Sequence, residues 1–120
     1  MGSARLTKAR RVRRRGEYQH VFKLGLRAHG RYLTMLVAPN TAGTARLGIV
    51  ASRKLGDSVR RNRAKRLIRE VFRKTSPPPS GPGLDLVVIP KRELFDASYP
   101  GLEIDFRGTL KRCAARVPRD

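Results

Sequence analysis

Hydrophobic positions recur with a helical period between residues 57 and 75. After Gly56, Asp57 or Ser58 can cap a helix. Five apolar residues then follow the i, i+3, i+4, i+7, i+8 spacing: Ala64, Leu67, Ile68, Val71 and Phe72. The sequence therefore predicts an amphipathic helix that ends near Thr75 and packs its apolar stripe on a protein core.

The opposite side of this predicted helix is strongly basic. At about 100° per residue, a ridge of polar side chains lies opposite the apolar stripe: Asn62, Arg66, Arg69 and Arg73, with Arg61 and Lys65 on one shoulder. Ten basic residues lie between Arg53 and Lys74, against only two acids, Asp57 and Glu70. An ordinary solvated face mixes both signs, whereas arginine forks match phosphate. The pattern favours a surface that binds a polyanion.

Shorter patterns predict the remaining elements. Residues 16–24 fit a short helix, whose apolar face is Tyr18, Val21 and Phe22. Residues 31–39 and 47–52 fit two strands, which a hairpin loop over 40–45 would make antiparallel. Residues 84–89 form a nearly continuous apolar run, typical of a buried strand. The proline-rich stretch 76–83 predicts a surface loop, residues 90–99 a second loop, and residues 100–117 a last helix.

These elements predict one α+β domain of αββαβα type. A small sheet of three to four strands would carry the long basic helix, and a strand–helix–strand crossover is ordinarily right-handed. We expect the domain to span residues 16–117. Before it, residues 1–15 hold seven basic residues and no acid, which predicts an arm that is disordered in the free protein.

The overall charge narrows the choice of partners. Twenty-eight Lys and Arg residues against nine Asp and Glu give a net charge of +19 over 120 residues, which attracts nucleic acid or an anionic membrane. The sequence contains no apolar run of about 20 residues that could span a membrane. Its basic start lacks the apolar core of a signal peptide and fits a nucleic-acid arm at least as well as a transit peptide. With one cysteine, Cys113, and hence no disulfide, we expect a cytoplasmic protein.

The residue types offer little for catalysis. His20 and His29 have no cysteine partner and no metal-ligand spacing, and the nine acids are scattered along the chain. A two-metal nuclease needs several carboxylates that converge at strand ends, and no Walker-type glycine loop occurs. The polypeptide is therefore predicted to bind a ligand, with no catalytic residue of its own.

The basic helix and its flanks resemble a known family. Ser52-Arg-Lys-Leu-Gly56 precedes an Arg61-Asn62-Arg63 element, and Leu67-Ile-Arg-Glu70 follows it. The whole stretch is similar to the signature of the bacterial ribonuclease P protein subunit. The resemblance implies a ribosomal protein S5 domain 2-like fold with an unusual left-handed βαβ crossover. It also implies that eight residues contact the catalytic RNA subunit: Arg53, Lys54, Arg61, Asn62, Arg63, Lys65, Arg66 and Arg69.

The resemblance implies a second surface for the substrate. In the family, aromatic residues of the first helix line a cleft for the single-stranded 5′ leader of precursor tRNA, and Tyr18 and Phe22 match these positions. A strand aromatic of the family aligns with Leu36 here, so the third stacking platform is either Tyr32, expected on the same strand face, or missing. The leader-binding residues expected are Tyr18, Phe22, Tyr32, Thr34 and Leu36.

The function implied is that of the protein subunit of ribonuclease P, an endoribonuclease. It would help to remove the 5′ leader, while the RNA subunit catalyses the cleavage with Mg²⁺ that it mainly holds itself. The main alternative is a structural RNA-binding protein of ribosomal type, which needs no holoenzyme. A DNA-binding helix-turn-helix protein fits less well, because strands flank the basic helix, and a protein-only nuclease lacks the carboxylates.

Overall fold

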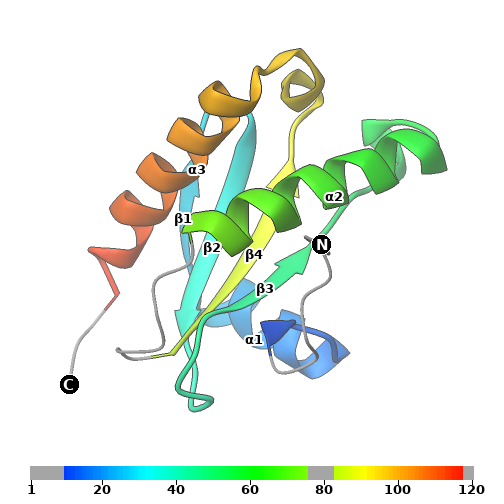
Figure 1. The fold of residues 1–120 in the computed structure, drawn as a ribbon. Coiled ribbons are helices and arrows are strands. Elements are labelled where there is room, and N and C mark those ends of the chain that lie inside the picture. Colours follow the sequence, from blue (N-terminus) through cyan, green and yellow to red (C-terminus); the bar gives the residue numbers. More distant parts are fainter. Residues whose placement is uncertain (1–9, 76–82, 118–120) are drawn as a thin grey trace.

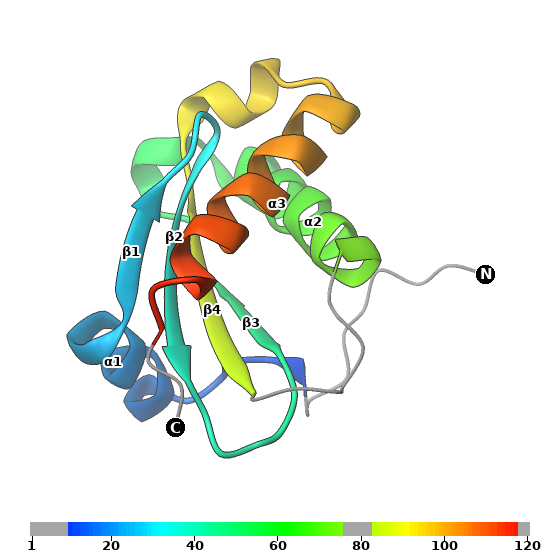
Figure 2. The same cartoon turned by 90° about the vertical axis from the view of Figure 1, so that its left-hand side faces the viewer.

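The computed structural model describes residues 10–75 and 83–117. Four strands form one mixed sheet in the order β1-β2-β4-β3. Helices α2 and α3 cover one face and α1 lies against the other, as Figure 1 and Figure 2 show. The elements in chain order are α1 (Arg15–Leu24), β1 (Leu26–His29), β2 (Leu33–Pro39), β3 (Arg46–Ile49), the 3₁₀ helix η2 (Arg53–Leu55), α2 (Ser58–Thr75), β4 (Leu84–Pro90), the 3₁₀ helix η3 (Arg92–Asp96) and α3 (Tyr99–Ala114).

Strand β4 joins the two halves of the sheet. It pairs antiparallel with β2 and parallel with β3, so that Leu86 has Val37 on one side and Leu47 on the other. Helix α2 connects β3 to β4. In Figure 1 both strands point up the page, and the chain passes in front of the sheet from β3 on the right to β4 on its left. The crossover is therefore left-handed, the rare hand for this connection.

Two expectations about the strands are wrong. Strands β2 and β3 do not form an antiparallel hairpin, because β4 lies between them. Strand β2 instead pairs antiparallel with β1, which makes the element order αβββαβα. Strand β1 has no clear signal in the sequence, because it has four residues, of which only Ala28 is buried. The α+β class and the single small sheet of four strands agree with the prediction.

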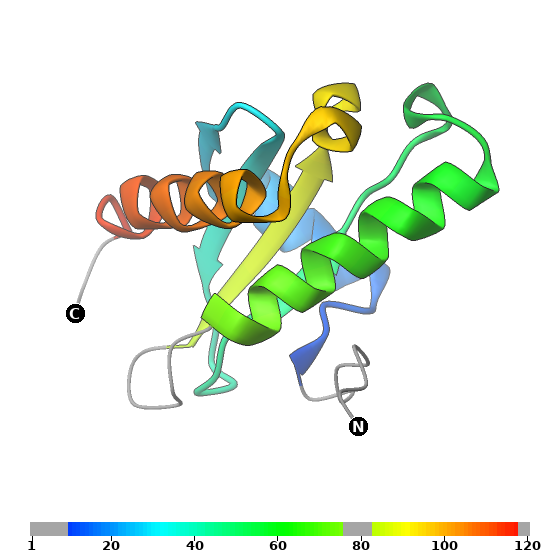
Figure 3. The same ribbon diagram turned by 45° about the horizontal axis from the view of Figure 1, so that its top comes forward.

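The sheet separates two hydrophobic cores. The larger core lies beneath α2 and α3, which Figure 3 shows across the same face, and it includes Phe72, Phe106 and Met35. The smaller core lies beneath α1 and contains Val21, Leu36, Ala38 and Val87. Residues of β2 alternate between the two cores, as strand side chains must, so all of residues 33–38 are buried.

The helices follow the sequence pattern closely. Helix α2 begins where predicted, since Asp57 Oδ1 accepts a hydrogen bond from the Arg60 backbone N–H at 2.9 Å. Its stripe is buried at Ala64, Ile68, Val71 and Phe72 and partly buried at Leu67. Helix α3 is capped by Ser98, whose hydroxyl accepts from the Gly101 N–H at 3.1 Å. The predicted loop over residues 90–99 contains η3.

The chain before α1 contacts the sheet. Val12 is buried, and its N–H donates to the Leu47 carbonyl at 2.9 Å, while Arg11 forms a parallel bridge to the same residue. Residues 11 and 12 therefore lie beside β3, ahead of the domain start expected at residue 16. The rest of the predicted arm and most of the proline-rich loop, residues 1–9 and 76–82, lie outside the described residues.

Candidate nucleic-acid interface

The predicted RNA-binding residues gather on α2 and η2. Arg53 and Lys54 are exposed on η2, next to the start of α2. On α2 itself, Asn62, Arg63 and Arg66 are exposed. The other three predicted residues are half-buried: Arg61, Lys65 and Arg69. Lys65 and Arg69 face β3 and the N-terminal segment, with which they line a pocket. The structure therefore brings all eight to one continuous region, which we call the α2 ridge.

The α2 ridge carries positive charge that the protein itself does not balance. Glu70 is the one acid within α2, and it pairs with Lys74 at 3.6 Å, one turn further along the helix. Within the described parts of the chain, Arg63 and Arg66 form no ion pair with a carboxylate. Like charges this close repel one another, so a bound polyanion would stabilise the ridge.

A pocket of about 270 Å³ continues the ridge toward α1. Four cationic side chains line it, two from α2 and two from the segment before α1: Lys65, Arg69, Arg11 and Arg13. Val12, Tyr18 and residues 47–49 complete the lining, and no acid is among these described residues. Arg11 and Arg13 are not among the predicted site residues, because the basic run that contains them predicts a disordered arm. The signal was Val12, an apolar residue in a basic run.

Tyr18 lies between this pocket and the sheet. A Cβ atom on Gly48 would lie 2.8 Å from the Tyr18 hydroxyl oxygen, so only glycine leaves room for the ring there. Burial raises the pKa of the Tyr18 phenol above its ordinary value, although the hydrogen bond from the Ile49 N–H and the charge of Arg69 oppose this shift. The phenol therefore stays neutral at physiological pH.

Phe22 is the most open aromatic of the expected leader site. Its side chain follows Tyr18 by one turn of α1 and is 43% exposed. Thr34 is nearly buried, and its hydroxyl lies 3.0 Å from Nδ1 of His29. Leu36 is 1% exposed and packs beneath α1 with Val21, so its side chain is closed to a ligand.

Tyr32 does not join these residues. It lies in the turn before β2, and its ring packs into the core beneath α3, 3.8 Å from the position of a Cβ on Gly101. The guanidinium of Arg31 lies over the ring at 5.3 Å from its centroid. The expectation that Tyr32 shares a face with Leu36 is wrong, because the period of two holds only within a strand and β2 begins at Leu33.

Helix α1 is fixed to the sheet by a polar network centred on Arg46. Its Nε and Nη2 donate to the two carboxylate oxygens of Asp85 at 2.7 Å each, and its Nη1 donates to Glu17 Oε2 at 3.0 Å. Glu17 Oε1 also accepts the backbone N–H groups of Arg13 and Arg14. These two backbone bonds and then Arg46 lower the pKa of Glu17 to about 2, against the opposing effect of burial. The network sets the position of Tyr18 and Phe22 over the sheet.

Within residues 10–75 and 83–117, no group of three or more His, Cys, Asp or Glu side chains is placed to hold a metal ion. His20 is exposed on α1, and Cys113 is buried with its thiol 2.9 Å from the Leu26 carbonyl. None of the described helices is long and apolar enough to cross a membrane. Fold and surface define a small α+β protein with a cationic ridge beside an aromatic helix.

Comparison with known proteins agrees with this description. The ribonuclease P family model matches residues 6–114. The ribonuclease P protein component of Clostridium botulinum is 34% identical over 105 residues, 88% of this chain and 95% of that protein. That of Thermotoga petrophila is 41% identical over 90 residues, 75% of this chain and 76% of that protein. The chain therefore belongs to the ribonuclease P protein family.

Solved structures of the family share the fold. A ribonuclease P protein from Thermotoga maritima, in complex with 1-(4-fluorophenyl)-2-thiourea, superposes with a TM-score of 0.74 at 34% identity, covering 85% of this chain and 98% of that one. A Staphylococcus aureus ribonuclease P protein mutant with defective mRNA degradation activity gives a TM-score of 0.78 at 29% identity, covering 89% and 90%.

Proposed function

We propose that this chain is the protein subunit of ribonuclease P. It binds the catalytic RNA subunit and the 5′ leader of precursor tRNA, and so assists removal of the leader to give the mature 5′ end in the cytoplasm. The observation that carries the proposal is the α2 ridge, a row of arginines without carboxylate partners in the described chain, in a member of this family. The chain is then one subunit of an endoribonuclease.

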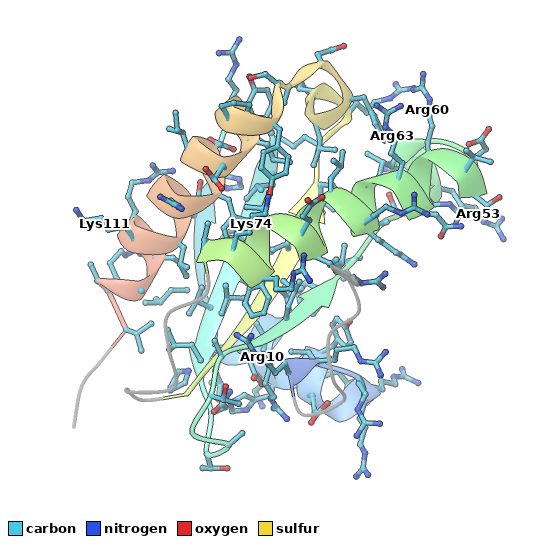
Figure 4. The ribbon with its side chains drawn as sticks, in the orientation of Figure 1. Arg10, Arg53, Arg60, Arg63, Lys74 and Lys111 are labelled. Atoms are coloured by element: carbon cyan, nitrogen blue, oxygen red, sulfur yellow. The ribbon has the colours of Figure 1, made fainter. Side chains whose placement is uncertain are left out.

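The α2 ridge supplies the contact with the catalytic RNA. Its guanidinium groups stand on a rigid helix whose opposite side is buried, so their spacing is fixed before RNA arrives. Each phosphate contact releases counterions, which makes affinity fall with salt. Arg66→Ala should weaken binding to the RNA subunit and reduce the salt slope by roughly 0.7–0.9. Lys111→Ala, on the exposed side of α3 in Figure 4, is the control and should leave the slope unchanged.

The aromatic side of α1 supplies the contact with the leader. Phe22 presents an open ring, and aromatic rings stack on any base, which suits leaders of varied sequence. Phe22→Ala should weaken binding of long-leader precursor tRNA by about 1–3 kcal/mol and leave mature tRNA unaffected. Leu24→Ala is the matched control, because Leu24 is also an exposed apolar residue. At about 100° per residue, it projects from the opposite side of α1 to Phe22. An equal loss for both RNAs would show that the Phe22 ring serves only the fold.

The proposal assigns the chemistry to the RNA subunit. Mg²⁺ would activate the attacking water and stabilise the leaving oxygen, as it does in nucleases. The described side chains do not form a site for this ion, since no three His, Cys, Asp or Glu residues are placed to hold a metal. The proposal therefore assigns Mg²⁺ to the RNA subunit. The protein's part is to bind, to orient the leader and to offset phosphate charge with its own positive charge.

The RNA that co-purifies with the native protein distinguishes this proposal from a structural RNA-binding protein. Purification of the native protein should recover one discrete large RNA together with precursor tRNA. Recovery of ribosomal subunits would instead support a structural RNA-binding protein.

A further inference from the structure

An arginine–aromatic pair lies at the start of α2, outside the residues assigned above. Arg60 is in the first turn of α2, and its guanidinium carbon lies over the ring of Phe95 in η3, 5.2 Å from the ring centroid. Figure 4 shows Arg60 and Arg63 together at this end of the helix, near η3. The pair thus connects α2 with η3, and β4 lies between these two elements in the sequence.

The Arg60 side chain is held along its length. Gly56 has a φ of +143°, and a Cβ there would lie 2.7 Å from Cδ and 3.1 Å from Cβ of Arg60, so the aliphatic stem packs over the bare glycine backbone. Asp57 fixes the Arg60 backbone through its capping hydrogen bond. Phe95 then supports the head group. Gly56, Asp57 and Phe95 together preorganise one guanidinium, which lowers the entropy lost when it binds a ligand.

The supported guanidinium remains open to a ligand. Arg60 is exposed, and none of the described carboxylates forms an ion pair with it. A guanidinium is planar, so with one face toward an aromatic ring its other face and its N–H edge stay available. Phosphate needs only the N–H edge, which Arg63 offers with no aromatic ring of the described chain behind it. The ring behind Arg60 therefore favours a planar ligand, a nucleic-acid base.

We propose that Arg60 and Phe95 form a stacking platform for one unpaired base of the catalytic RNA subunit. The proposal rests on the function proposed above and adds a base contact to the phosphate contacts of the α2 ridge. The partner is the RNA subunit rather than the leader, because the platform lies at one end of α2, whereas α1 with Phe22 lies on the opposite face of the sheet, as Figure 2 shows.

The test uses the full-length protein and the host's catalytic RNA subunit transcribed in vitro. Arg60→Lys keeps the charge but removes the planar group, and Phe95→Leu keeps an apolar side chain but removes the ring. Each should weaken binding about 5- to 10-fold, within the range for a lost stacked base, with the salt slope of the wild type. The double variant should lose little more than either single variant, because the two residues act as one unit.

Arg107→Lys is the matched control, since it makes the same chemical change at an exposed arginine of α3, outside the α2 ridge. Its affinity should stay within about twofold of the wild type because the charge is kept. Chemical probing should show one RNA base that the wild type protects and Arg60→Lys leaves reactive. Wild-type affinity for Arg60→Lys, or equal losses for Arg60→Lys and Arg107→Lys, would overturn the platform alone. If the wild type binds this RNA no better than an unrelated RNA of equal length, the proposed function itself fails.

Arg60→Lys decides the question even if Phe95→Leu destabilises the fold, because Arg60 is exposed and its substitution leaves the core intact. Thermal unfolding of each variant shows which binding losses reflect folding.

Discussion

Glu17→Gln should destabilise the protein in a way that depends on pH. Glu17 accepts two backbone hydrogen bonds at the start of α1 and a third bond from the Arg46 guanidinium. Glutamine has the same shape and suits the third position of a helix, but it carries no charge. The substitution therefore isolates the contribution of the carboxylate charge to the docking of α1.

The size of the effect follows from the pKa of Glu17, which the folded protein lowers from 4.5 to about 2. Each pH unit between these values corresponds to about 1.4 kcal/mol, which gives a ceiling of about 3.4 kcal/mol. The Glu17 side chain is 27% exposed, so solvent screening should reduce the contribution to about 1–2 kcal/mol. Because the folded pKa lies below the unfolded one, this stabilisation is complete above pH 4.5 and is lost as the pH falls toward 2.

Urea unfolding of the wild type and Glu17→Gln at neutral pH and at several values below pH 4.5 tests this reasoning. The free energy of unfolding should differ by about 1–2 kcal/mol at neutral pH, and the two proteins should converge as the acid is titrated. Glu103→Gln is the control, because the ion pair of Glu103 within the described chain is a long 3.9 Å contact with Arg107. It should change stability by less than about 0.5 kcal/mol. A difference of the same size at every pH would refute the electrostatic account.

Three further predictions concern packing and reactivity. Gly48→Ala should displace the Tyr18 ring, lower stability by about 1–3 kcal/mol and weaken binding of long-leader precursor tRNA; unchanged leader binding would contradict the placement of the ring. Asp105 accepts two backbone N–H groups of the turn between β1 and β2 at 2.8 and 2.9 Å. Asp105→Ala should therefore lower the free energy of unfolding, measured by thermal unfolding, by about 2–4 kcal/mol. An unchanged free energy would mean that the turn is stable without Asp105. Burial raises the pKa of the Cys113 thiol. At a pH of about 8, where a free thiol begins to ionise, iodoacetamide should therefore label the folded protein slowly and the denatured protein quickly.

The helices could be predicted from the sequence because their signals are local. The apolar stripe and capping residue of α2 lie within one stretch of chain and gave its limits at Ser58 and Thr75. Strand pairing was harder, because partners are chosen across the whole chain. The two strands before α2 looked like a hairpin, yet β4, which follows α2, separates them. Tyr32 was misplaced for a related reason, since one residue outside β2 no longer obeys the strand alternation.

The candidate site also contains residues with a local signal in the sequence and residues without one. The α2 ridge could be read from the sequence, because one helix carries most of it. The polar network at Arg46 could not, since its partners Glu17 and Asp85 lie 29 and 39 residues away. Arg11 and Arg13 likewise join the pocket only because Val12 between them is buried against β3.

Cleavage of precursor tRNA by the host's catalytic RNA at limiting Mg²⁺, with and without this chain, tests the central claim most directly. The account predicts that the protein accelerates release of the 5′ leader and that the gain grows when the leader is long enough to reach Phe22. It also predicts that the protein alone leaves the precursor intact. Equal rates with and without the protein, or cleavage by the polypeptide unaided, would contradict it.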